Sequence, residues 1–207
     1  MAHIPDGVLS APVLITGGLV AFGLLAVALR RLDDERLPQA AVLSATFFVA
    51  SLITIPVGPS SVHLLLNGLM GLLLGWTAVP ALFVALLLQS VFFGYGGILV
   101  LGVNTMDMAL PALVCSLLLI PVMRRVAPKR LFWVGALAGG LGVMLTGALV
   151  ALVLGLSGKA FLPAAGVIMV AYLPLALVEA LVTGTVIAFL SRVAPELLQQ
   201  TDGASYG

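Results

Sequence analysis

Long apolar runs dominate this sequence and decide what it can fold into. Hydrophobic residues make up 62% of the 207 positions and charged residues only 8%, whereas a soluble domain carries about 25% charged residues. A helix that spans a bilayer needs about 20 consecutive, mainly apolar residues, and the chain offers several runs of that order. The sequence therefore predicts an all-α, polytopic membrane protein.

Charges, turns and Pro/Gly clusters divide the chain into seven apolar stretches. We expect spanning helices at 11–29, 39–56, 62–77, 79–93, 108–123, 131–156 and 164–191. The third and fourth are short, so region 62–93 leaves counts of six or eight open. The whole chain, 1–207, is expected to form one transmembrane domain, with an N-terminal segment 1–10, a helix bundle 11–191 and a tail 192–207.

The basic residues predict how the bundle is oriented. Eight of the nine follow the first, fifth and seventh spans: Arg30, Arg31, Arg36, Arg124, Arg125, Lys129, Arg130 and Arg192. Because cytoplasmic loops are enriched in Lys and Arg, those segments are expected inside, with Lys159 outside. The N-terminus is then external and the tail cytoplasmic, as an odd number of spans requires.

The few polar residues near the predicted external side are candidate functional groups. His3 lies at the N-terminus and His63 at the expected start of the third span. Between the fourth and fifth spans, the glycine-rich but apolar segment 94–107 predicts a re-entrant loop shielded by helices, closed by Asn104 and Asp107. We expect Asp6 to cap the first helix and Asp107, in one interpretation, to cap the fifth.

Four residues of the third span recur every four positions: His63, Asn67, Gly71 and Gly75. They would share one helix face, with glycines that allow close helix contact. His63 and Asn67 would then point into the bundle.

The first three residues could form a chelate for a metal ion. If Met1 is retained, its amine, the amides of Ala2 and His3 and the His3 ring supply four nitrogens in a plane. If Met1 is removed, the Ala2 amine, the His3 amide and the His3 ring supply three, and His63 is the other histidine available. Planar four-nitrogen geometry suits Ni(II) or Cu(II) better than Zn(II).

Other features exclude several function classes. The near balance of charge gives no support for a nucleic-acid partner, and Cys115 alone cannot form a multi-cysteine site. The motifs H-E-x-x-H and G-x-S-x-G are absent, which argues against an enzyme, and so is the phosphate-binding loop of an ATPase. Gln89 and Glu179 lie inside expected spans, and such a glutamate is a functional candidate, expected to be hydrogen-bonded rather than a metal ligand.

Three motifs resemble those of the CbiM/NikM family, the substrate-binding components of energy-coupling factor nickel/cobalt transporters. They are Met1-Ala2-His3-Ile4-Pro5-Asp6-Gly7, Gly58-Pro59-Ser60-Ser61-Val62-His63-Leu64-Leu65-Leu66-Asn67-Gly68 and Gly96-Gly97-Ile98-Leu99-Val100-Leu101-Gly102-Val103-Asn104-Thr105-Met106. The resemblance implies seven transmembrane helices and an N-terminal segment inserted from outside. It further implies a planar site formed by the terminal amine, a histidine amide and ring, and a histidine of the third helix.

Those roles fall on His3 and His63 here, with the amine of Ala2 or Met1. Ala2 departs from the family pattern, and removal of Met1 would restore it. Asn67, Asn104 and Asp107 are expected to orient these ligands, as metal-bound histidines usually require.

The resemblance also implies partners and a location. These are an energy-coupling transmembrane subunit, two separate ATPase subunits, a small accessory membrane subunit in some systems, and a bacterial inner membrane. The ion, Ni²⁺ or Co²⁺, is the transported substrate, and no organic cofactor is expected. The alternative is a stand-alone divalent-metal channel or secondary carrier, for which the sequence shows no inverted repeat.

Overall fold

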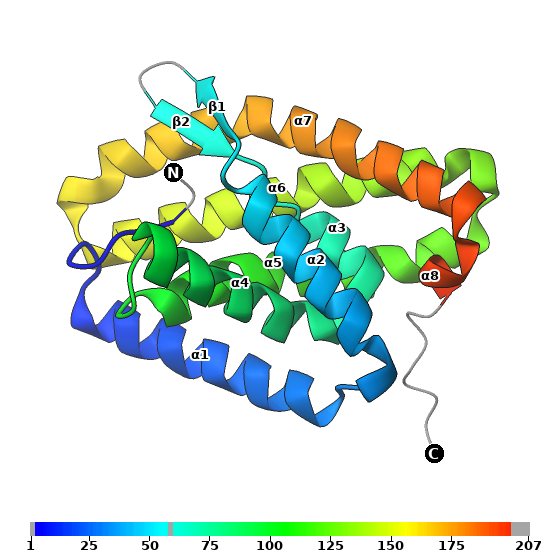
Figure 1. The fold of residues 1–207 in the computed structure, drawn as a ribbon. Helices are drawn as coiled ribbons and strands as arrows, with labels where there is room; N and C mark the ends of the chain where they lie inside the picture. The colour runs from blue at the N-terminus through cyan, green and yellow to red at the C-terminus, as the bar shows by residue number, and fades with distance from the viewer. Residues whose placement is uncertain (1–2, 58–59, 200–207) are drawn as a thin grey trace.

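The computed structural model describes residues 3–57 and 60–199, which form a helical bundle (Figure 1). The α-helices in this part of the chain are α1 (Ala11–Arg30), α2 (Leu37–Ala50), α3 (Asn67–Leu74), α4 (Ala78–Phe93), α5 (Leu101–Arg125), α6 (Leu131–Ser157), α7 (Leu162–Val193) and α8 (Pro195–Gln199). Short 3₁₀ turns lie at Asp34–Arg36, Gly75–Thr77, Pro128–Arg130 and Lys159–Phe161. Two strands, β1 (Thr54–Val57) and β2 (Ser60–His63), form an antiparallel hairpin.

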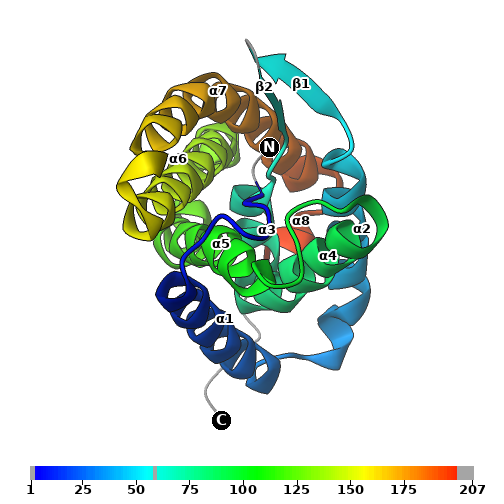
Figure 2. The same ribbon diagram turned by 90° about the vertical axis from the view of Figure 1, so that its left-hand side faces the viewer.

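Helix α3 lies near the middle of the bundle in the view of Figure 2, and all eight of its residues are buried. At about 1.5 Å of rise per residue, it is too short to cross a bilayer. It contacts α5 and α6 most extensively, while α1 and α7 present many apolar side chains outward. Such an apolar outer surface suits lipid rather than water.

Among the described residues, five helical stretches are long and apolar enough to cross a membrane. They are Ala11–Arg30, Asn67–Phe93, Leu101–Arg125, Pro128–Ser157 and Lys159–Val193. The helical membrane-protein class is thus confirmed, with seven helices, α1–α7, ahead of the short α8 in the part described. The count of seven full spans stays a prediction, because α2 has only 14 residues and α3 only eight. The external position of the N-terminus also stays a prediction.

The expected second and third spans are wrong at their facing ends. Thr54–Val57 pairs with Ser60–His63, so that Thr54 lies opposite His63 in the ladder. Pro56 cannot donate a helical hydrogen bond, and β-branched residues around it favour a strand. His63 therefore belongs to β2 and not to a helix, which breaks the expected stripe with Asn67, Gly71 and Gly75.

The glycine-rich segment is also shorter than expected. Helix α5 begins at Leu101, so Asn104 and Asp107 lie on a helix and neither closes a loop nor caps one. Asn104 is bonded inside the bundle, and a polar side chain with a buried partner does not need to end a helix. Only residues 94–100 form the non-helical link.

Glycines let α3 approach its neighbours closely. A Cβ on Gly68 would overlap the carbonyl oxygen of Ala138 on α6, and one on Gly71 would overlap that of Ala112 on α5. Such small-residue contacts are the usual basis of helix packing in membranes. The buried helix α3 is therefore held at backbone distance from both neighbours.

We expect Gly71→Ala to lower the stability of the bundle by about 1–3 kcal/mol, the usual effect of overpacking. The added methyl group meets backbone, which cannot rotate away. Thermal unfolding in detergent measures this effect. Gly23→Ala is the matched control, because nothing lies within 4 Å of its Cβ position. Equal melting temperatures for the two variants would contradict the packing described here.

Candidate metal centre

Two histidines that are distant in the sequence meet at one end of the bundle. The ring centroids of His3 and His63 are 5.0 Å apart, with 22° between the ring planes. The side chains are only 5% and 3% exposed, respectively. His3 comes from the segment before α1, and His63 is the last residue of β2. The structure thus brings together the two imidazoles that the sequence singles out.

The N-terminal segment is tied to the bundle by Asn104. The backbone N–H of Ile4 donates to Asn104 Oδ1 at 3.1 Å, and Asn104 Nδ2 donates to the Ile4 carbonyl at 3.2 Å. Ile4 is itself buried, in an apolar cluster that includes Val100 and Val150. This pair of bonds fixes the backbone directly after His3.

Asp6 provides a second tie, which the sequence reasoning missed. Its Oδ1 accepts from the N–H of Val100 at 3.0 Å, and its own N–H donates to the Gly96 carbonyl at 3.4 Å. Asp6 is therefore not the cap of α1, whose N-cap residue is Ser10. Asp6 and Val100 are 94 positions apart in the sequence, so no local pattern signalled this contact.

Only glycine fits beneath the N-terminal segment at position 96. Gly96 has a φ of 76°, which favours glycine. A Cβ there would lie 2.7 Å from Asn104 Nδ2 and 3.4 Å from the Cβ of His3. The link 94–100 thus packs directly against residues 3–6.

The bonding of His63 leaves one ring nitrogen available. Its Nδ1 lies 2.9 Å from the carbonyl oxygen of Leu64. Because a carbonyl can only accept, Nδ1 must carry the proton and Nε2 the lone pair of the neutral ring. Nε2 is buried without a hydrogen-bond partner in the described structure. A buried nitrogen lone pair with no partner is a ready metal ligand.

Both imidazoles are held in the neutral form. Burial, and then the nearby His63, lowers the pKa of His3 from 6.5 to about 3. Burial also lowers the pKa of His63, although the bond to Leu64 acts in the opposite direction. Neutral rings are the form that binds a metal ion.

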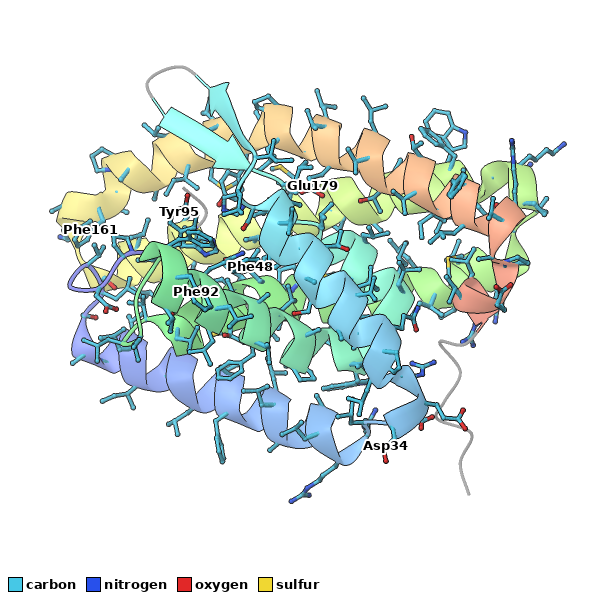
Figure 3. All side chains as sticks on the ribbon, in the orientation of Figure 1. Asp34, Phe48, Phe92, Tyr95, Phe161 and Glu179 are labelled. Carbon is cyan, nitrogen blue, oxygen red and sulfur yellow. The ribbon has the colours of Figure 1, made fainter. Side chains whose placement is uncertain are left out.

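Tyr95 lies beside the histidine pair. The two imidazole rings are nearly parallel, and His3 also stacks with Tyr95 at 6.2 Å and 17°; Tyr95 is labelled in Figure 3 at this end of the bundle.

Asn67 and Asp107 make no hydrogen bond to either histidine among the described residues. Asn67 donates to Thr146 Oγ1 at 2.7 Å, and no bond between Asn67 and His63 is present in the part described. Both carboxyl oxygens of Asp107 are buried without a partner among the described residues. Their expected support of the metal ligands stays a prediction.

The described side chains include no larger group of metal-binding residues. Within residues 3–57 and 60–199, no group of three or more His, Cys, Asp or Glu side chains could hold a metal ion. Met1 and Ala2, the predicted amine ligands, lie outside the described residues, as do Gly58 and Pro59 of the second motif.

Comparisons with known proteins agree on metal transport. Residues 3–197 match the family described as "CbiM: Cobalt uptake substrate-specific transmembrane region". A putative metal transport protein of Haemophilus influenzae is 42% identical over 205 residues, covering 98% of this chain and 100% of that protein. The fused nickel transport protein NikMN of Rhodobacter capsulatus is 31% identical over 95% of this chain and 63% of its own length.

A crystal structure of a truncated transition metal transporter has the same fold. It superposes with a TM-score of 0.76 at 28% identity, covering 92% of this chain and 99% of the other.

Acid should release the N-terminal segment from the bundle. Because the pKa of His3 in the docked state is about 3 instead of 6.5, docking is fully stabilised above about pH 6.5 and weakens as the pH falls toward 3. We expect amide protection of residues 3–10, measured by hydrogen exchange and corrected for intrinsic rates, to fall over that range. In His3→Phe, which keeps the Asn104 and Asp6 ties, protection should persist to lower pH. The same pH profile in both proteins would rule out His3 as the cause.

Proposed function

The chain belongs to the CbiM family of cobalt uptake substrate-specific transmembrane regions, and we propose that it captures Ni²⁺ or Co²⁺ at the outer face of a bilayer for an energy-coupled importer. It is a cobalt/nickel uptake component of the membrane, and its relatives are metal transport proteins rather than enzymes. The proposal rests on the buried pair of His3, from the N-terminal segment, and His63, from β2.

The proposed site is a plane of four nitrogens. The His3 ring and amide supply two, the terminal amine supplies a third, and His63 Nε2 supplies the fourth if the chain starts at Ala2. A start at Met1 would add one amide to the chelate and could close the plane without His63. The ties from Asn104 and Asp6 support either form, because they fix the backbone next to His3.

This donor set favours ions that accept strong planar fields. Ni(II) takes such geometry readily, whereas Zn(II) prefers a tetrahedron. The family includes proteins named for cobalt and for nickel, so both ions belong to the proposal. The ion is cargo, which must enter and leave the site.

The proposed orientation places the basic end of the bundle in the cytoplasm. Basic residues stand in the last turns of α1, α5 and α7, and these turns lie at the end opposite the N-terminal segment in Figure 1. That arrangement fits a bacterial inner membrane protein with an external N-terminus. An energy-coupling transmembrane subunit, two ATPase subunits and, in some systems, an accessory subunit would act with it.

Blocking the N-terminus should abolish high-affinity binding. An amine must be free and deprotonated to bind a metal, and its ordinary pKa is about 7.7–8.0. We expect an acetylated or tagged Ala2-start protein to bind Ni²⁺ more than about 100-fold more weakly than the free form, since loss of a mere supporting contact costs about 10- to 100-fold. Isothermal titration with Ni²⁺ measures the difference.

The control for this titration is His63→Ala with a free N-terminus, which should bind about as weakly in the Ala2-start protein. A tag after Gly207 should have no effect. Tight binding by the blocked protein would remove the amine from the site.

Metal uptake should depend on the ATPases. We expect cells that produce this chain with its coupling subunits to lose Ni²⁺ accumulation when the phosphate-binding lysine of the ATPases is replaced. This chain has no ATP-binding loop of its own, so it cannot supply that energy. Radioactive Ni²⁺ uptake is the measurement. Undiminished uptake would favour the stand-alone carrier.

A further inference from the structure

Glu179 is a carboxylate in the middle of α7, and its bonds reach the chain that carries His63. Its side chain is fully buried, and its Oε1 accepts from the backbone N–H groups of Leu65 and Leu66, the second at 2.9 Å. Figure 3 shows it beside the link between β2 and α3. A carboxylate at membrane depth is costly and is usually retained for a function.

One peptide group connects Glu179 to the His63 ring. The N–H of Leu65, which donates to Glu179, belongs to the same peptide group as the carbonyl of Leu64, which accepts from His63 Nδ1 at 2.9 Å. The sequence of contacts is therefore carboxylate, peptide N–H, peptide C=O and imidazole Nδ1–H. An N–H that donates to a carboxylate makes the carbonyl of its own peptide a stronger acceptor, because hydrogen bonds in series polarise one another.

The same carboxylate holds a strained turn. Leu66 has a φ of 48°, and it is the non-glycine residue with positive φ in the part of the chain that the structure describes. That conformation is disfavoured for leucine, so something must hold it, and the N–H of Leu66 donates to Glu179. The turn sets the direction in which the chain runs from His63, at the end of β2, to the start of α3.

The backbone of Glu179 is itself fixed. A Cβ on Gly139 would overlap the carbonyl group of Glu179, so α6 and α7 are in backbone contact at this level. The contacts between α6 and α7 are the most extensive in the bundle. The closely packed pair of α6 and α7 therefore holds the backbone of Glu179, whose side chain bonds to the turn at Leu66.

We propose that Glu179 is the positioning residue that aims His63 Nε2 at the metal, acting through the Leu64–Leu65 peptide group. This inference rests on the proposed role of His63 as a ligand. Metal-binding histidines commonly donate their second ring nitrogen to a carboxylate or a carbonyl, which fixes the tautomer and raises ligand basicity. Here the carbonyl is the direct partner, and the carboxylate acts one peptide group behind it.

The test is a double-mutant cycle on the full chain with a free N-terminus, with Ni²⁺ as the probe. We expect Glu179→Leu to weaken Ni²⁺ binding by about 10- to 100-fold, the usual cost of losing such a supporting contact. Glu179→Gln should lose less, because its amide oxygen can still accept both N–H groups. The Ni²⁺ absorption spectrum of Glu179→Leu should approach that of His63→Ala, because both lose the fourth planar nitrogen.

Thr183→Val is the matched control for a general effect on α7. Thr183 lies one turn from Glu179, is fully buried, and its Oγ1 has no partner among the described atoms. The Thr183→Val protein should bind Ni²⁺ as tightly as the unmodified protein does. Melting temperatures identify any variant that fails to fold. If Glu179→Leu does not fold, Glu179→Gln replaces it in the double-mutant cycle.

The cycle separates this inference from its premise. In a His63→Ala background, replacing Glu179 should cause no further loss, because the residue acts only through His63. An equal loss in both backgrounds would overturn the inference, and so would unaltered binding by Glu179→Gln and Glu179→Leu. If His63→Ala alone binds Ni²⁺ normally in the Ala2-start protein, the proposed site itself is wrong.

Discussion

Three stretches of non-helical chain lie at the histidine end of this helical bundle, and each brings backbone groups that need hydrogen-bond partners. They are residues 3–10, the link 64–66 and the link 94–100. In lipid an unpaired backbone group costs several kcal/mol, so such chain is tolerated only where protein satisfies it. Asn104, Asp6 and Glu179 do so, each by pairing with backbone from a distant segment. The rest of the site depends on these pairings.

The pairings also fix the chain next to both histidines. Asn104 and Asp6 fix the backbone beside His3, while Glu179 fixes the turn beside His63. The groups that satisfy the irregular backbone are thus the groups that hold the chain beside His3 and His63.

The sequence predicted the bundle well because lipid imposes a simple rule on apolar runs. It predicted the two histidines through rarity and through resemblance to known motifs, and the structure brings them together. The hairpin was missed because the residues around Pro56 are apolar, and their hydropathy is the same whether they form a strand or part of a spanning helix. The helical positions of Asn104 and Asp107 were missed because polar residues near a glycine-rich run suggest a loop. The partner of Glu179 lies 114 residues away, and no local pattern in one sequence encodes such a contact.

We propose that the N-terminal amine, backbone and His3 share one ion with His63. X-ray absorption at the nickel edge of the Ni²⁺-loaded, Ala2-start protein tests it most directly, because it reports donor type, donor number and geometry together. The account predicts a four-coordinate, planar ion with nitrogen donors only and scattering from two imidazole rings. A six-coordinate ion with oxygen donors, or a signal from a single imidazole, would contradict it.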